Sequence, residues 1–213
     1  MPVHPDVRVV SVAPERLAGW LDGFTTRHGR PEPALDDTRL LLTSPDGAMA
    51  SIRLDWGPLP AADPVAEVVA ACLRPRRAAG LIVRKRAHGV GIFSGEKLLE
   101  GRHDNHYVQS RTKAGGWSQQ RYARRRGNQA DRAYREAAED ACAVLVPHLA
   151  ELEVLATAGD QAAVSQVLAT PALSGLLALP RVRVDAVPDP NAGVLAGFGK
   201  RLREVRITLN ELA

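Results

Sequence analysis

The feature that most constrains the fold of this chain is a helical pattern that begins at Ser118 and runs to about Leu152. Only Gly127 and Pro147 interrupt it. At about 100° per residue, its small and apolar residues gather on one side of a helical wheel. That side consists of Ala123, Ala130, Tyr134, Ala137, Ala141, Val144 and Leu145. The pattern predicts one long helix with a single face in a hydrophobic core.

Arginines occupy the other side of the same predicted helix. Within about 60° of Arg121 on the wheel lie Arg124, Arg125, Arg132 and Arg135, while Arg126 falls at the edge of the apolar side. Asp131 is the only acid in the first several turns, so i,i+4 pairs between acids and bases are scarce there. Because guanidinium groups match phosphate oxygens, we interpret this side as a phosphate-binding face rather than an ordinary solvated one.

The segment directly before this helix combines glycines, amides and cations. It reads Ala114-Gly115-Gly116-Trp117-Ser118-Gln119-Gln120, and Arg111 and Lys113 precede it. Two glycines permit positive φ angles or a close approach to another molecule. Polar amides at the mouth of a basic helix suit a partner that carries phosphates. We therefore predict that this glycine-rich loop is the functional centre of the chain.

The first 75 residues predict a small α+β portion. The expected elements are a strand over 7–12, a helix over 13–28, a loop over 29–37, a hairpin of strands 39–43 and 48–54, and a helix from about residue 64. Arg74-Pro75-Arg76-Arg77 marks a change of texture in the sequence. We therefore expect two domains, over residues 1–75 and 76–213.

Residues 76–213 predict a mixed sheet with packed helices. Strands are expected over 79–85, 89–93, from 97 onwards, over 106–110, and, after the long helix, over 153–157, 181–187 and 205–209. Helical segments are expected after Asp160, which can act as an N-cap, and around Leu173–Leu179. Turns between the first strands indicate an antiparallel meander. This order of elements is compatible with an RNase H-like α/β sandwich.

Charge and composition narrow the class of partner. The formal net charge is only +4, but cations cluster at residues 74–86 and 111–135, which favours a directed phosphate-binding surface. Aromatic residues make up 4% of the chain, too few for an extended base-stacking platform. Cys72 and Cys142 lie in apolar helical patterns, which predicts buried free thiols in a reducing compartment. With no signal-peptide pattern and no apolar run of membrane-spanning length, we expect a cytoplasmic protein that makes no membrane contact.

A metal site and a turn are alternative interpretations of His103-Asp104-Asn105-His106. Histidine and aspartate side chains are metal ligands, but no third His or Cys cluster follows at a usable spacing. A polar turn between strands explains the same residues. We therefore favour the turn and expect neither a metal nor a cofactor.

The letters Gly115-Gly116-Trp117-Ser118-Gln119-Gln120-Arg121-Tyr122-Ala123-Arg124-Arg125-Arg126 resemble the catalytic segment of eukaryotic and archaeal class I release factors. In that family a Gly-Gly-Gln loop is followed by Ser, two residues, Arg, an aromatic residue, Ala, Arg, any residue and Arg. Trp117 stands where that family has its glutamine. The displaced Gln119 makes Gly116-Trp117-Ser118-Gln119 similar to the loop of the Vms-like release factors of ribosome quality control, above all their actinobacterial members. The resemblance is strong over about residues 111–135 and extends at the level of the fold over 77–213.

This resemblance implies a release-factor type of catalytic domain that hydrolyses the ester between a nascent peptide and tRNA on stalled or split ribosomes. It implies a catalytic set of Gly115, Gly116, Ser118, Gln119 and Gln120, in which Gln119, or else Gln120, positions a water molecule. Together with the wheel, it implies RNA contacts by Arg111, Lys113, Arg121, Arg124, Arg125, Arg132 and Arg135. The implied partners are the large ribosomal subunit and peptidyl-tRNA, and we expect a monomer.

Two alternatives stay open at this point. A basic fold of the RNase H type is also compatible with a nuclease that removes the CCA end of tRNA, although Glu96, Glu100 and Asp104 form no convincing set of ligands for two metals. Trp117 in the loop is compatible with a non-catalytic RNA- or ribosome-binding module. The state of the tRNA product tests the first alternative, and the effect of Gln119→Ala on peptide release tests the second.

Overall fold

The computed structural model describes residues 8–54, 63–105 and 118–213, and of residues 105 and 118–131 it describes the backbone alone. The chain folds as two compact units, unit 1 (Met1–Pro75 with Arg203–Ala213) and unit 2 (Arg76–Leu202). The sequence predicts that residues 203–213 belong to the domain that begins at residue 76, whereas the structure places them in unit 1. The reason is that the last strand pairs with strands of the N-terminal sheet.

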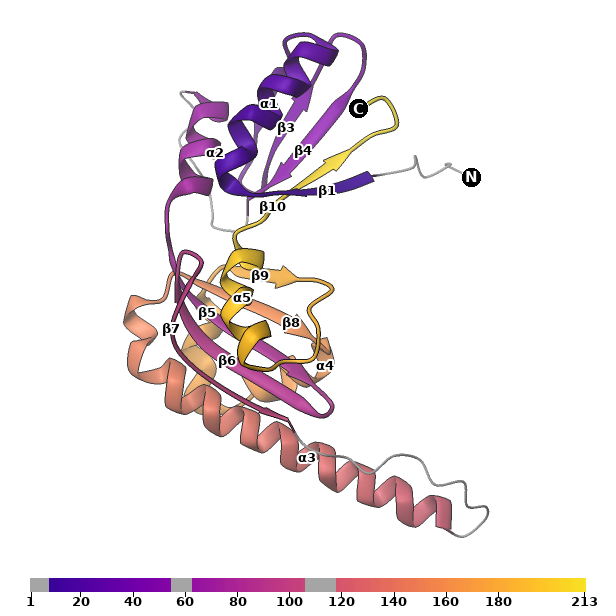
Figure 1. The fold of residues 1–213 in the computed structure, drawn as a ribbon, viewed down its shortest axis with the longest axis vertical. Coiled ribbons are helices and arrows are strands. Elements are labelled where there is room, and N and C mark those ends of the chain that lie inside the picture. The colour runs from indigo at the N-terminus through magenta and orange to yellow at the C-terminus, as the bar shows by residue number, and fades with distance from the viewer. Residues whose placement is uncertain (1–7, 55–62, 106–117) are drawn as a thin grey trace. The chain divides into compact units, whose positions relative to one another are not determined.

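Unit 1 is a five-stranded antiparallel sheet with two helices packed on one face (Figure 1). Its strands are β1 (Arg8–Val12), β2 (Glu32–Leu35), β3 (Arg39–Thr43), β4 (Met49–Arg53) and β10 (Val205–Leu209), in the order β1-β10-β4-β3-β2. The helices are α1 (Pro14–His28) and α2 (Pro64–Leu73). Both helices, β1 and the β3–β4 hairpin confirm the elements that the sequence predicts.

One strand of unit 1 lies where the sequence analysis expected a loop. β2 pairs with β3, and Pro33 lies opposite Leu42. Proline has no N–H to donate, but β2 is the outermost strand of the sheet, where a missing donor is tolerated. The sequence predicts a loop here because of its prolines, but an edge strand can accommodate them.

Unit 2 is a mixed five-stranded sheet with helices on both faces (Figure 1). Its strands are β5 (Arg77–Arg84), β6 (Ala87–Ser94), β7 (Lys97–Asn105), β8 (Val154–Gly159) and β9 (Arg181–Val184), in the order β7-β6-β5-β8-β9. β5, β6 and β7 form the predicted antiparallel meander, and β5, β8 and β9 run parallel. This is the RNase H-like mixed sheet with packed helices that the sequence predicts. The strand predicted over residues 106–110 lies outside the described residues.

Two cores sandwich this sheet. One face is covered by α3 (Ser118–Leu145), η1 (Val146–Glu151), α4 (Gln161–Leu168) and η2 (Pro171–Ala178), and the other by α5 (Ala192–Leu202). β5 is buried on both faces, with Leu81 in the core under α3 and α4 and Ile82 in the core under α5. A central strand covered on both sides becomes a continuous apolar run, as its sequence shows.

Four residues of the predicted apolar side of α3 are confirmed, since Ala137, Ala141, Val144 and Leu145 are all buried in the core, and Tyr134 is partly buried against it. The side chains of Ala123 and Ala130, on the same side, lie outside the described part of the chain. The predicted end of α3 near Leu152 is wrong. α3 stops at Leu145 and a 3₁₀ helix follows, because Pro147 cannot continue the hydrogen-bond ladder.

The N-terminal half of α3 runs past the edge of the sheet of unit 2 (Figure 1). Ala133 is the first residue of this helix that is described as buried. From Ala133 back to Ser118, a rise of 1.5 Å per residue gives about 22 Å of helix. The start of α3 is therefore carried far from the hydrophobic core that anchors its other end.

Candidate functional site

The glutamines singled out in the sequence lie in the first turn of α3. The helix begins at Ser118, so Gln119 and Gln120 follow directly inside it. The first turn of a helix has backbone N–H groups without helical partners and a partial positive charge. Gly115, Gly116, Arg111 and Lys113 lie outside the described residues. The described backbone thus places Gln119 and Gln120 in the first turn at the projecting end of α3.

Two of the predicted RNA-binding arginines have described side chains. Both Arg132 and Arg135 are exposed. The Nε atom of Arg132 lies 2.8 Å from Oε1 of Glu136, one turn later on α3, and this hydrogen bond raises the pKa of Arg132. An exposed i,i+4 pair of this kind contributes little stability, so it does not prevent exchange for a phosphate. Arg121, Arg124 and Arg125 belong to the part of α3 whose backbone alone is described.

A partly buried cluster of hydrogen-bonded side chains anchors α3 to the sheet. Nε2 of His88, on β6, lies 2.9 Å from Oδ2 of Asp140, and Nη1 of Arg102, on β7, lies 3.1 Å from the other carboxylate oxygen. The His88 side chain is 2% exposed and that of Asp140 25% exposed. Burial alone raises the pKa of the Asp140 carboxyl, but the hydrogen bonds from His88 and Arg102 outweigh it and lower the pKa. We call these three residues the α3 anchor.

No residue of the α3 anchor stands out in the sequence as a candidate site residue. His88 is 52 residues and Arg102 is 38 residues from Asp140 along the chain. Neither a motif nor a period links positions so far apart. The available signal was a polar His88 at the start of an otherwise apolar strand, which indicates a buried partner.

The basic cluster at residues 74–86 does not form one surface. Arg77 is the first residue of β5 and Arg84 is the last, so the two groups of cations lie at opposite ends of this strand. At the first end, Nη2 of Arg77 lies 3.4 Å from Oε2 of Glu151. At the opposite end of the strand, Arg84 is the last residue of β5, and Lys85 and Arg86 follow it in the turn to β6.

The residues considered for metal binding or nucleophilic chemistry do not converge in the structure. His103 and Asp104 are on β7, and His106 lies outside the described residues. Within the described ranges, no group of three His, Cys, Asp or Glu side chains is arranged to hold a metal ion. Cys72 is buried as predicted, whereas Cys142 is only half-buried, and its partial burial raises the pKa of its thiol. None of the helices in the described part of the chain is both long and apolar enough to span a membrane.

The family model described as Actinobacteria/chloroflexi VLRF1 release factor matches residues 76–208. Since this match covers more than half of the chain, the protein belongs to that release factor family. The match includes all of unit 2 and most of β10.

Two solved structures resemble the chain more distantly. The archaeal translation termination factor aRF1 is 16% identical, with 68% of this chain and 45% of that chain covered at a TM-score of 0.37. An archaeal protein is 15% identical, with 75% and 48% covered at a TM-score of 0.39. The chain therefore spans about half the length of these proteins. No curated protein matches it.

Proposed function

We propose that this protein is a peptidyl-tRNA hydrolase that works with the ribosome, on stalled or split ribosomes. The observation that carries the proposal is the position of Gln119, in the first turn of the projecting end of α3, in a chain of the release factor family. The substrate would be the ester that joins a nascent peptide to the terminal ribose of tRNA. We propose a cytoplasmic monomer that meets this substrate on the large subunit.

The reaction needs a water molecule held beside the ester carbonyl. The water oxygen bonds to the carbonyl carbon, the ester C–O bond breaks, and the ribose oxygen leaves with a proton that derives from the water. An amide has no pKa near neutrality, so Gln119 would orient the water and would not remove its proton. Gln120 is the alternative in this role. Gly115 and Gly116 would let the backbone enter a narrow site, and Ser118 would begin the helix beside it.

The arginine side of α3 would hold RNA phosphates. The proposed contacts are Arg111, Lys113, Arg121, Arg124, Arg125, Arg132 and Arg135. Contacts to phosphates fix the position of a protein on RNA without reading its base sequence. This suits a hydrolase that must accept every tRNA.

The α3 anchor would hold the proposed catalytic end in place. Asp140 lies 21 residues after Gln119, which corresponds to about 32 Å along a helix. A small tilt of the axis of α3 about Asp140 would therefore move Gln119 by several ångströms. Fixing both carboxylate oxygens of Asp140 limits that tilt.

The test is peptide release from peptidyl-tRNA bound to isolated large subunits. Gln119→Ala should reduce the release rate on the order of 10²-fold, the size expected for loss of a positioning group, and leave subunit binding unchanged. Gln129→Ala, which removes an amide further along α3, is the matched control and should release peptide at the wild-type rate. Gln120→Ala tells the two candidate glutamines apart.

The products distinguish the remaining readings of the site. Peptide and intact tRNA support ester hydrolysis, whereas tRNA shortened at its 3′ end would replace the proposal with a CCA nuclease. Release that survives in both Gln119→Ala and Gln120→Ala would exclude the catalytic role of this segment. Binding without release in the wild type would indicate a non-catalytic module, with Trp117 as the first residue to replace.

A further inference from the structure

A hollow of about 590 Å³ lies beside the C-terminal ends of the parallel strands β5 and β8 in the sheet of unit 2. After β5 the chain turns into β6, and after β8 it passes through α4 to β9 on the opposite side. Connections that leave neighbouring strands in opposite directions open a crevice, and such crevices are the usual ligand sites of α/β sheets. Arg84, Lys85, Arg86, Gly159, Asp160 and Asp189 line the hollow.

The two acids that line the hollow are engaged by neighbouring groups. Oδ1 of Asp189 lies 3.3 Å from Nε of Arg84, which also donates a hydrogen bond to the carbonyl oxygen of Val187. Asp160 caps α4, and its carboxylate accepts hydrogen bonds from the N–H groups of Ala162 and Ala163 at 3.0 and 3.3 Å. The capping carboxylate occupies the start of α4, so the helix end itself offers no place for an anion.

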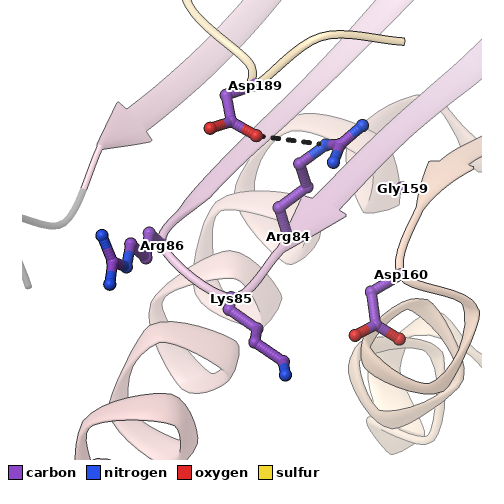
Figure 2. A pocket seen from close by; sticks show the side chains of 6 residues that line it. All are labelled: Arg84, Lys85, Arg86, Gly159, Asp160 and Asp189. Carbon is purple, nitrogen blue, oxygen red and sulfur yellow. Dashed lines mark ion pairs between the residues drawn. The ribbon is translucent and has the colours of Figure 1, made fainter. Parts of the chain in front are cut away.

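Lys85 and Arg86 are the cations that remain available. Both are exposed in the turn between β5 and β6. Figure 2 shows their charged ends pointing away from the pair formed by Arg84 and Asp189. Within the part of the chain that the structure describes, neither Lys85 nor Arg86 forms an ion pair. Two neighbouring like charges beside a hollow favour an anionic partner.

At the rim of the hollow, the backbone at the end of β8 is in close contact with the backbone at the end of β5. Gly159 has a φ of +91°, and a Cβ atom there would lie 2.2 Å from the carbonyl oxygen of Val83. The same oxygen accepts a hydrogen bond from the N–H of Asp160 at 2.8 Å. The end of β8 is therefore held against the end of β5, directly beside the basic turn.

The basic turn lies at the edge where α3 leaves the sheet. Ala87 pairs with Asn105, the last residue of β7, and His88 contacts Asp140 on α3. Towards its N-terminus, α3 runs past the sheet (Figure 1). An extended polyanion that follows the arginine side of α3 could therefore continue to Lys85 and Arg86.

We propose that Lys85 and Arg86, with the hollow beside them, form a second phosphate-binding site for the backbone of the RNA that α3 contacts. None of the described residues that line the hollow is aromatic, so the site would hold phosphates and not stack bases. The choice of RNA rests on the proposed function, but the binding itself does not depend on hydrolysis.

The experiment measures the affinity of the full chain for a fluorescein-labelled RNA hairpin with the sequence of a tRNA acceptor stem, at several salt concentrations. Lys85→Ala with Arg86→Ala should weaken binding on the order of tenfold, and the slope of log affinity against log salt should become shallower by about 1.5 to 2. The control is Lys97→Ala with Lys200→Ala. It removes the same charge from exposed positions at the opposite end of the strands, where Gly199 packs against the carbonyl oxygen of Glu96.

Equal affinity and salt slope in the Lys85/Arg86 variant and the wild type would overturn the proposal, as would an equal loss in the control. So would competition by polyglutamate as effective as competition by unlabelled hairpin, because it would show a generally acidic partner. Both variants change exposed side chains, and their thermal unfolding should match that of the wild type. If the Lys85/Arg86 variant loses RNA affinity while the wild type releases no peptide, this site stands and the hydrolase proposal fails.

Discussion

The imidazole Nε2 of His88 lies 2.9 Å from the carboxylate of Asp140, and this pair ties the central meander of unit 2 to its longest helix. The imidazole is buried, and the carboxylate receives Arg102 on its second oxygen. This pair favours one orientation of α3 on the sheet, because any other orientation would leave the buried imidazole or the carboxylate without its hydrogen-bond partner.

Asp140→Asn should destabilise unit 2 by about 1–3 kcal/mol, since it removes the charge from hydrogen bonds to His88 and Arg102 while keeping the shape of the side chain. Glu139→Gln removes the same charge from the exposed neighbouring position and should change stability by less than about 0.5 kcal/mol. Urea unfolding followed by far-ultraviolet circular dichroism measures both. A wild-type unfolding curve for Asp140→Asn would show that the pair contributes no stability.

The same carboxylate predicts how stability depends on acid. The pKa of Asp140 in the folded chain lies below its ordinary value of 3.8. Its contribution is therefore fully present above that value and is lost as the pH falls through the lower, folded-state pKa. The difference in unfolding free energy between wild type and Asp140→Asn should therefore be smaller at pH 3 than at pH 5. A difference that stays unchanged down to pH 3 would contradict this account.

Two glycines of α5 predict opposite outcomes for the same substitution. A Cβ atom at Gly199 would lie 2.2 Å from the carbonyl oxygen of Glu96, whereas one at Gly197 would meet no atom within 4 Å. Gly199→Ala should destabilise unit 2 by about 1–3 kcal/mol, because backbone must move. Gly197→Ala should stabilise it by up to about 1 kcal/mol, because alanine is the better helix former. Thermal unfolding of the two variants side by side is the measurement.

Replacing Arg121, Arg124 and Arg125 together with alanine should weaken binding to the acceptor-stem hairpin. The slope of log affinity against log salt should become shallower by about 2 to 3, because fewer phosphates are neutralised and fewer counterions are released on binding. Arg30→Ala, Lys97→Ala and Lys200→Ala combined are the control for lost charge, because all three side chains are exposed and lie outside α3. Fluorescence anisotropy over a salt series gives both quantities. An unchanged slope would mean that this side of α3 does not hold phosphates.

Local patterns were sufficient for most elements and for one face of the site helix. Ala137, Ala141, Val144 and Leu145 were assigned to the core from the helical period alone, and all four are buried. Asp160 was assigned as an N-cap from its position before an apolar helical run, and its carboxylate caps α4. Such features depend on neighbours within a few residues, so the sequence displays them directly.

The membership of the last strand was beyond the reach of local patterns. The sequence predicts β10 as the last strand, but its partners are β1 and β4, so it completes the sheet of unit 1. Arg8 pairs with Leu209 across nearly the whole chain. Pairing of this kind has no local signature, because any strand with a suitable apolar face could fill the same place.

The sequence by itself determined that α3 is a long helix with one buried face and a glutamine-bearing start, because its apolar residues recur with the period of a helix. Only the tertiary structure decided how that helix is held and what lies beside it. It brought Asp140 to His88 and Arg102, and it divided the basic cluster at residues 74–86 between the two ends of β5. Both depend on which strands pair and in which direction, and those choices are made by burial summed over the whole core.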